Sequence, residues 1–414
     1  MKPISFSPPS PPSSLSKASE DVVRLVVKNF LTLDDVDCSL GKLTIFIGPQ
    51  AEGKSLLAKL VDFFYESLST AIYHDDYKGL KDHIRNRFLR TFPKHIWEND
   101  NFAVSFFISS YSINIEYAKK RLYIRFNQTL EKDVKKFFSS KKELEKNDQP
   151  SIFSWITQNI HDFPYPFRIR PTFIPALRQL FSYAGFEGFI YNIAYNREDV
   201  DSVLFKFASD LPFHRQFWER DSEQARDTFN KSISRILKGK YHQIQKNDFI
   251  INKKEKTIPV SLASSGQQEA LPLLLYTRIP FTSIFIVEEP EAHLFPSSQK
   301  ELTGHLCRTL NRPNVSRMVI TTHSPYVLSS FNNFIAAHDV LGKDEERIAA
   351  MEKIIPRNCW IAYDDVQCFF VENGRITSMR NDECRMIDAE RIDACSDSII
   401  TEYSNVMNIL HAGG

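Results

Sequence analysis

The chain has 414 residues, 42% of them hydrophobic, so it can form two or three domains with a buried core. Its 52 Lys and Arg nearly balance its 51 Asp and Glu, which argues against nucleic acid or membrane binding through overall charge. The six cysteines lack metal-ligand spacing, the N-terminus lacks an apolar signal core, and no apolar run reaches the roughly 18 residues of a membrane helix. We therefore expect a soluble, cytoplasmic protein with reduced thiols and no membrane contact.

The first 64 residues combine a tail with the start of a folded core. Residues 1–19 are rich in Pro and Ser and predict a flexible tail, whereas residues 20–64 predict the N-terminal half of an α/β core. The runs VVRLVVKNF and KLTIFIG predict two strands joined by a turn over 34–41. The second strand leads into a glycine-containing loop, and SLLAKLVDFFYESL then has the apolar spacing of a helix.

The rest of the chain predicts an interrupted core. Residues 65–255 are charge-rich and mostly helical, with a strand pair in NFAVSFFISSYSINIEYA and RLYIRFN, and predict an insertion or lid. Residues 256–340 contain the apolar runs TSIFIVEEPE and SRMVITTHSP, typical of a parallel sheet buried on both faces. Residues 341–414 predict an edge strand pair and a closing helix. The predicted fold class is α/β, with a mixed or parallel central sheet and a largely helical insertion.

The loop after the second predicted strand matches G-x-x-x-x-G-K-[ST], a pattern that binds nucleotide phosphates through backbone N–H groups and a helix N-terminus. The lysine of the pattern reaches the terminal phosphates of ATP, and the following serine binds Mg²⁺. An ordinary glycine turn before a helix is the alternative. Because an acid pointing into such a loop would repel phosphate, we expect the Glu52 side chain to face solvent. The predicted nucleotide-binding residues are Gly48, Gln50, Ala51, Glu52, Gly53, Lys54, Ser55 and Leu56.

Two apolar strands end in groups that suit phosphate chemistry. The run IFIV is followed by Glu288 and Glu289, which predicts that Glu288 binds Mg²⁺ with Ser55 and that Glu289 activates the attacking water. A buried strand that emerges at an acidic turn is the alternative. The run VITT precedes His323, at the strand end where open α/β sheets bind ligands, so His323 is a candidate sensor of the γ-phosphate.

The segment LASSGQQE at 262–269 resembles the signature of ABC-type ATPases, and the acidic strand and His323 follow it in family order. With GPQAEGKS as phosphate loop, the chain resembles the ATPase heads of the RecF, SMC and OLD group, and thus a P-loop ABC-type ATPase head. The resemblance implies that two copies sandwich ATP and that His323 is the switch histidine. It further implies that the signature contacts the γ-phosphate of the opposite subunit. By this resemblance the signature residues are Ser264, Ser265, Gly266 and Gln267.

Three further sequence segments each allow two interpretations. EEPEAHLFP resembles a family run at the dimer interface and makes Glu291 and His293 interface candidates, whereas His293 alone reads as a structural histidine and not as a zinc ligand. TFIPALR resembles a motif of OLD-like ATPases, in which Arg178 either approaches phosphate or the partner, or extends along a proline turn. A basic cluster either meets nucleic acid or is a solvated face. It comprises Arg85, Arg87, Arg90, Lys94 and His95.

A compact head of this kind resembles the ATPase components of bacterial antiphage systems such as PARIS and Septu. The resemblance implies a homo-oligomer that senses a phage protein or nucleic acid and controls a separate effector, such as a Toprim or HNH nuclease. We expect no nuclease within this chain, because the paired acids Asp364–Asp365 and Asp382–Glu383 read as structural turns. The alternatives are a RecF-like DNA repair ATPase and a nucleotide-gated scaffold with negligible turnover.

Overall fold

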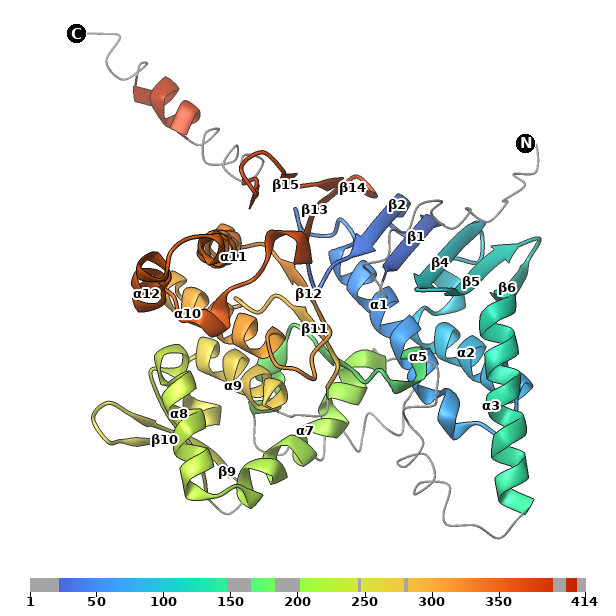
Figure 1. Cartoon of the computed structure of the whole chain (residues 1–414), viewed down its shortest axis with the longest axis horizontal. Coiled ribbons are helices and arrows are strands. Elements are labelled where there is room, and N and C mark those ends of the chain that lie inside the picture. Colours follow the sequence, from blue (N-terminus) through green and yellow to red (C-terminus); the bar gives the residue numbers. More distant parts are fainter. Residues whose placement is uncertain are drawn as a thin grey trace.

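The computed structural model describes residues 22–146, 165–182, 202–244, 247–278, 282–389 and 400–407 (Figure 1). The predicted flexible tail, residues 1–19, lies outside these ranges. No helix within them is long and apolar enough to cross a membrane.

An eleven-stranded mixed sheet organises the described chain, in the order β6-β5-β4-β1-β2-β14-β13-β3-β12-β11-β7. A three-stranded sheet, β10-β9-β8, and a two-stranded sheet, β15-β16, lie apart from it. The strands are β1 (Val23–Phe30), β2 (Leu33–Leu40), β3 (Leu43–Ile47), β4 (Phe102–Ile108), β5 (Tyr111–Ala118), β6 (Arg121–Phe126), β7 (Pro171–Ile174), β8 (Gly239–Ile244), β9 (Asn247–Asn252), β10 (Thr257–Pro259), β11 (Ile284–Glu288), β12 (Arg317–Thr322), β13 (Val366–Glu372), β14 (Arg375–Ser378), β15 (Arg380–Asn381) and β16 (Met386–Ile387).

The main sheet has a parallel half and an antiparallel half. Strands β13, β3, β12, β11 and β7 run parallel, so their carboxyl ends meet at one edge. Strands β2, β1, β4, β5 and β6 pair antiparallel. This arrangement confirms the predicted α/β class with a mixed central sheet. The loops that follow β3, β11 and β12 therefore lie side by side.

Helices cover both faces of the parallel half. Phe46 belongs to the hydrophobic core that includes α1 and α2, whereas its neighbours Ile45 and Ile47 belong to the core that includes α9, α10 and α11. This alternation is expected of a strand buried on both faces. The helices are α1 (Lys54–Ser69), α2 (Tyr77–Thr91), α3 (Gln128–Lys146), α5 (Tyr165–Arg168), α7 (Ser202–Arg220), α8 (Glu223–Leu237), α9 (Ser265–Thr277), α10 (Pro296–Leu310), α11 (Pro325–His338) and α12 (Glu345–Ile354).

Three predictions about the strands need correction. The turn predicted over 34–41 is mostly strand β2, in which buried residues alternate with exposed acids such as Asp35 and Asp37. The pair β13–β14 lies in the middle of the sheet and not at its edge, because β13 pairs with β3 and its residues are apolar and mostly buried. The strand pair predicted within 65–255 is three strands, β4–β6, which extend the main sheet from β1.

Candidate functional site

The phosphate loop joins buried strand β3 to helix α1. Gly48 has a φ of 152°, and a Cβ there would lie 2.2 Å from the carbonyl oxygen of Val371. Gly53 has a φ of 100° and occupies the N-cap of α1. Both positions favour glycine, because residues with a side chain rarely adopt such backbone angles. The strand, loop and helix thus follow in the predicted order, and the α1 N-terminus faces the loop.

Lys54, the first residue of α1, is buried against its own loop. Its ammonium donates hydrogen bonds to the carbonyl oxygens of Gly48, at 2.9 Å, and of Pro49. Burial lowers the pKa of Lys54, while the nearby carboxylates of Glu289, Glu52 and Glu291 act in the opposite direction. The lysine therefore lies within electrostatic reach of the acids that follow β11.

The other loop residues divide between surface and core. Gln50, Ala51 and Ser55 are exposed, and Leu56 packs against the core that contains α1. The Glu52 carboxylate, which we expected to face solvent, is partly exposed and forms a hydrogen bond with another loop. It accepts a hydrogen bond of 2.5 Å from the backbone N–H of Asn373, in the exposed turn between β13 and β14. This contact was missed because it joins residues more than three hundred positions apart.

The carboxyl end of β11 carries both predicted catalytic acids. Glu288 is buried and accepts a hydrogen bond of 3.3 Å from the backbone N–H of Ala176. Glu289 turns away from the strand with a φ of 41°, a left-handed conformation that is uncommon for a residue with a side chain. Its Oε1 lies 3.5 Å from Nε2 of His323. The backbone turn thus separates a buried carboxylate from a half-exposed one.

The carboxylate of Glu289 is held ionised by its neighbours. The hydrogen bond with His323 lowers the pKa of Glu289 most, and the positive charges of Lys54 and Arg178 also lower it, against partial burial. An ionised carboxylate beside a histidine can accept a proton from a water molecule. The structure thus brings Lys54, Glu288, Glu289 and His323 together at one edge of the sheet.

Glu291 orders the loop that carries His323. Its Oε1 accepts hydrogen bonds from the Thr322 hydroxyl at 2.6 Å and from the His323 backbone N–H at 2.8 Å. The side chain of Glu291 is buried, so its carboxylate is held inside this chain. Its sequence context indicated an interface residue, but its contacts position the histidine loop. His293, by contrast, is exposed.

Arg178 is fully buried and joins the signature helix to the acidic strand end. Its Nη1 donates to the carbonyl oxygens of Pro175 at 2.6 Å and Glu288 at 2.7 Å, and its Nη2 donates to that of Glu289 at 2.9 Å. Its Nε donates to the carbonyl oxygen of Glu269 at 3.1 Å and lies 3.3 Å from the Glu269 carboxylate, which is 2% exposed. Because Arg178 is 0% exposed, it does not extend to solvent along a proline turn, and it instead binds the backbone carbonyl groups that it joins.

The signature residues form the N-terminus of α9. Ser264 is the N-cap and forms a capping box with Gln267, whose Nε2 donates to the carbonyl oxygen of Leu237 at 2.6 Å. Gly266 packs on the loop after β11, where a Cβ would lie 2.6 Å from the carbonyl oxygen of His293. Ser264 and Ser265 are exposed. These contacts run to α8 and to the loop after β11, and leave the two serines accessible at the helix start.

The donor set at the strand ends fits Mg²⁺, which prefers oxygen ligands. Glu288 pairs in register with Thr321 on neighbouring β12. The Thr321 hydroxyl and Oε2 of Glu291 are buried, and each lacks a hydrogen-bond partner among the described residues. Such oxygens are costly to bury unless an ion, a water molecule or a ligand satisfies them. Ser55 and Glu288 therefore remain the candidate magnesium residues.

The paired acids near the C-terminus take part in local contacts. The Asp382 carboxylate accepts hydrogen bonds from the Tyr363 hydroxyl at 2.8 Å and from Arg380 at 3.2 Å. Asp364 lies 3.8 Å from the same arginine. These contacts favour the structural reading of both pairs.

Comparisons with known proteins bear mainly on the second half of the site. Residues 180–328 match a family model described as an AAA ATPase domain. No curated protein matches the chain.

Three solved structures resemble the fold at a distance. The SMC head domain from Thermotoga maritima is 12% identical, with a TM-score of 0.36 over 86% of this chain and 97% of that chain. The Smc head bound to the C-winged helix domain of ScpA is 11% identical, with a TM-score of 0.43 over 87% and 98%. An Smc head with an extended coiled coil, bound to the C-terminal domain of ScpA from Pyrococcus furiosus, is 10% identical, with a TM-score of 0.40 over 91% and 99%.

The family match covers the segment that carries Glu288, Glu289 and His323, and it supports an ATPase of the AAA type.

Proposed function

We propose that this chain binds and hydrolyses ATP with Mg²⁺ as an ABC-type ATPase. The observation that carries the proposal is the convergence of Lys54, Glu289 and His323 on the loops after β3, β11 and β12, which are neighbouring parallel strands. The carboxyl edge of an open parallel sheet is where such folds bind ligands.

The proposal assigns a role to each residue of the site. The phosphates of ATP lie on the loop N–H groups and the α1 N-terminus, and Lys54 exchanges its carbonyl partners for phosphate oxygens. Ser55 and Glu288 would hold Mg²⁺, which would neutralise phosphate charge. Glu289 orients the attacking water and accepts its proton. His323, beside Glu289, keeps that carboxylate ionised and contacts the γ-phosphate.

Two copies of the chain enclose the nucleotide in this proposal. The signature serines are exposed at the start of α9, where the phosphates of a second subunit can reach them. Two large apolar side chains nearby in the sequence are also exposed. Leu262, just before α9, is 77% exposed, and Phe295, in the loop between β11 and α10, is 75% exposed. Burial of such side chains against a second copy contributes favourably, at about 1.5–3 kcal/mol for each fully buried side chain.

Phosphate release and ATP binding by wild type and two variants test this function. Lys54→Ala should lose ATP binding, because the loop then lacks its buried cation. Glu289→Gln should bind ATP with wild-type affinity but hydrolyse it at least about a hundredfold more slowly. A Glu289→Gln protein with wild-type turnover contradicts the assignment of Glu289. A wild type that binds ATP without turnover supports a nucleotide-gated scaffold instead.

At the level of the cell, we propose that the ATP-bound oligomer senses phage infection and controls a separate toxic effector, such as a Toprim or HNH nuclease. The support is the sequence resemblance to the ATPase components of antiphage systems such as PARIS and Septu. Phage plating on cells that carry this gene with its neighbouring genes tests the proposal. Protection should require Lys54, and equal protection by Lys54→Ala would contradict it.

A further inference from the structure

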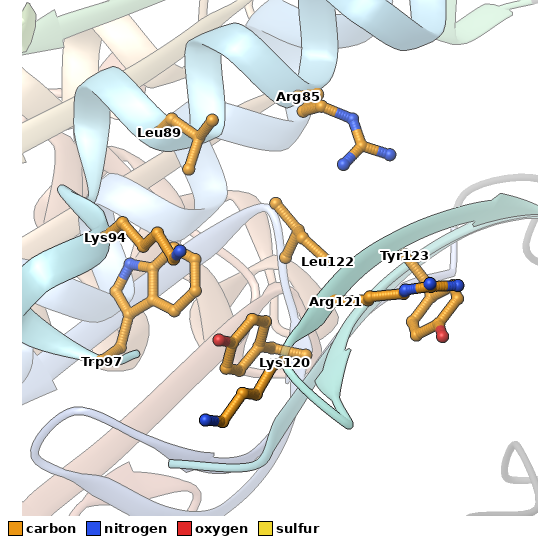
Figure 2. A pocket seen from close by; sticks show the side chains of 9 residues that line it. Arg85, Leu89, Lys94, Trp97, Lys120, Arg121, Leu122 and Tyr123 are labelled. Carbon is orange, nitrogen blue, oxygen red and sulfur yellow. The ribbon is translucent and has the colours of Figure 1, made fainter. Parts of the chain in front are cut away.

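A hollow of about 440 Å³ opens far from the phosphate loop, between α2, the short helix η2 (Lys94–Ile96) and the β5–β6 hairpin (Figure 2). The uncharged residues that line it form its floor, and they are Leu89, Trp97, Tyr117, Leu122 and Tyr123. Two polar atoms of the floor have hydrogen-bond partners within the chain. The Trp97 indole N–H donates to the Phe92 carbonyl oxygen at 2.9 Å, and the Tyr117 hydroxyl donates to a backbone carbonyl at 3.3 Å. The floor therefore presents mainly carbon to a ligand.

Four cations surround this floor and come from separate elements. Arg85 lies on α2, Lys94 on η2, Lys120 in the β5–β6 turn and Arg121 at the start of β6, and all four are exposed. Among the described residues no Asp or Glu lines the hollow. Only Lys94 has an acidic neighbour in a recorded ion pair, Glu98 at 3.9 Å, and both side chains are about half exposed, so that pair contributes little. We call this site the basic hollow.

The segment around the basic hollow carries the positive charge of the chain. Residues 77–126 contain ten Lys and Arg against four Asp and Glu, a net charge of +6, whereas the whole chain has a net charge of +1. Two of these cations pair with acids away from the hollow, since Arg87 pairs with Asp62 and Arg125 with Glu116. Of the four cations around the floor, which we call the rim cations, only Lys94 forms an ion pair with a described residue, its exposed contact with Glu98. The near-zero overall charge thus conceals a strongly basic segment.

We propose that the basic hollow binds single-stranded nucleic acid, with one unpaired base on the apolar floor and the flanking phosphates on the rim cations. A nucleotide strand combines planar bases, whose ring faces pack on apolar and aromatic side chains, with a charge at every backbone step, which matches an apolar floor ringed by cations. The volume lies in the range of pockets that hold small molecules. A base within a duplex is stacked and paired and cannot enter, so the hollow favours a single strand. This site is independent of ATP hydrolysis.

Fluorescence anisotropy of a labelled oligothymidylate, measured without ATP, tests the proposal. The double variant Lys120→Glu/Arg121→Glu should bind at least about tenfold more weakly than wild type. Because each phosphate contact to a single strand contributes about 0.7 to the slope of log K against log salt, the slope should fall by about 1.4. The matched control Lys253→Glu/Lys254→Glu reverses two exposed charges in the β9–β10 turn and should bind like wild type.

Three competitors separate the proposal from other ligands. An oligonucleotide with abasic sites keeps every phosphate but no base, and should bind about tenfold more weakly than the intact strand. A duplex of the same length and a poly-glutamate peptide should also bind more weakly. Equal affinity for the abasic strand would refute base insertion. Tighter binding of the duplex or the peptide, or equal loss in the control variant, would refute the site as a whole. Lys54→Ala should bind the oligonucleotide normally, so failure of the ATPase proposal leaves this test intact.

Discussion

Replacement of Arg178 by lysine tests whether the buried guanidinium fixes the catalytic strand end. The guanidinium donates four hydrogen bonds, to the carbonyl oxygens of Pro175, Glu269, Glu288 and Glu289. Lysine keeps the positive charge that Glu269 requires, but its donors share one nitrogen and cannot span these directions. We expect Arg178→Lys to fold and to lose about two of the four hydrogen bonds.

The expected cost follows from the burial of the side chain. Hydrogen bonds that involve a charged group contribute about 1.5–3 kcal/mol each, so two lost bonds lower the free energy of unfolding by about 3–6 kcal/mol. Glu289, whose φ of 41° is uncommon, loses the donor that holds its carbonyl oxygen. We expect kcat for ATP hydrolysis to fall at least about tenfold. ATP affinity should change little, because the recorded hydrogen bonds of Arg178 run to the β7 and β11 ends and to α9, and not to the phosphate loop.

Urea unfolding and ATPase kinetics of Arg178→Lys give both quantities. Arg235→Lys is the matched control, since Arg235 is 79% exposed and lies 3.6 Å from Glu301, and its unfolding free energy should change by less than about 0.5 kcal/mol. An Arg178→Lys protein with wild-type stability and wild-type kcat would show that the reasoning about this arginine is wrong.

Three further predictions concern the phosphate loop, the histidine loop and the core. Gly48→Ala should raise the Kd for ATP more than about tenfold in a nucleotide-binding titration, because its Cβ would lie 2.2 Å from the Val371 carbonyl oxygen; an unchanged Kd contradicts the strain argument. Glu291→Gln keeps the shape but not the charge that holds the His323 loop, and should lower kcat about tenfold with little change in ATP affinity; unchanged kcat refutes that role. Burial lowers the pKa of His305 from 6.5 to about 3, so its unfolded form takes up a proton first as the pH falls below 6.5. Between pH 7 and pH 5 this effect should lower the unfolding free energy of wild type by about 2 kcal/mol. Urea titrations of His305→Gln at the two pH values should lack this loss, and an equal loss in the variant contradicts the role of His305.

Local sequence was sufficient for three strands of the parallel half, β3, β11 and β12. The apolar runs before Glu288 and His323 are short, unbroken and buried on both faces, so strand and position followed directly from the residues. The same reasoning found β3, the phosphate loop and α1, because glycines at 48 and 53 separate a strand from a helix. These elements give the candidate site its main residues.

Contacts between distant segments could not be predicted in this way. Strand β13 is central because it pairs with β3, and nothing in its own pattern distinguishes a central strand from an edge strand. Arg178 becomes buried only when β7, α9 and β11 meet, and its carbonyl partners carry no sequence signal. In β2 the buried residues alternate with exposed acids, a pattern typical of a half-exposed strand, but acidic residues are also common in turns, so the local pattern favours either structure.

The mass in solution of wild type and Glu289→Gln, with and without Mg-ATP, tests the central claim that two copies enclose nucleotide. Because Glu289→Gln should bind ATP without hydrolysing it, we predict that Mg-ATP converts this variant into a dimer or a larger oligomer, while wild type shows the same species only transiently. Masses of both proteins that stay unchanged with saturating Mg-ATP would contradict the account.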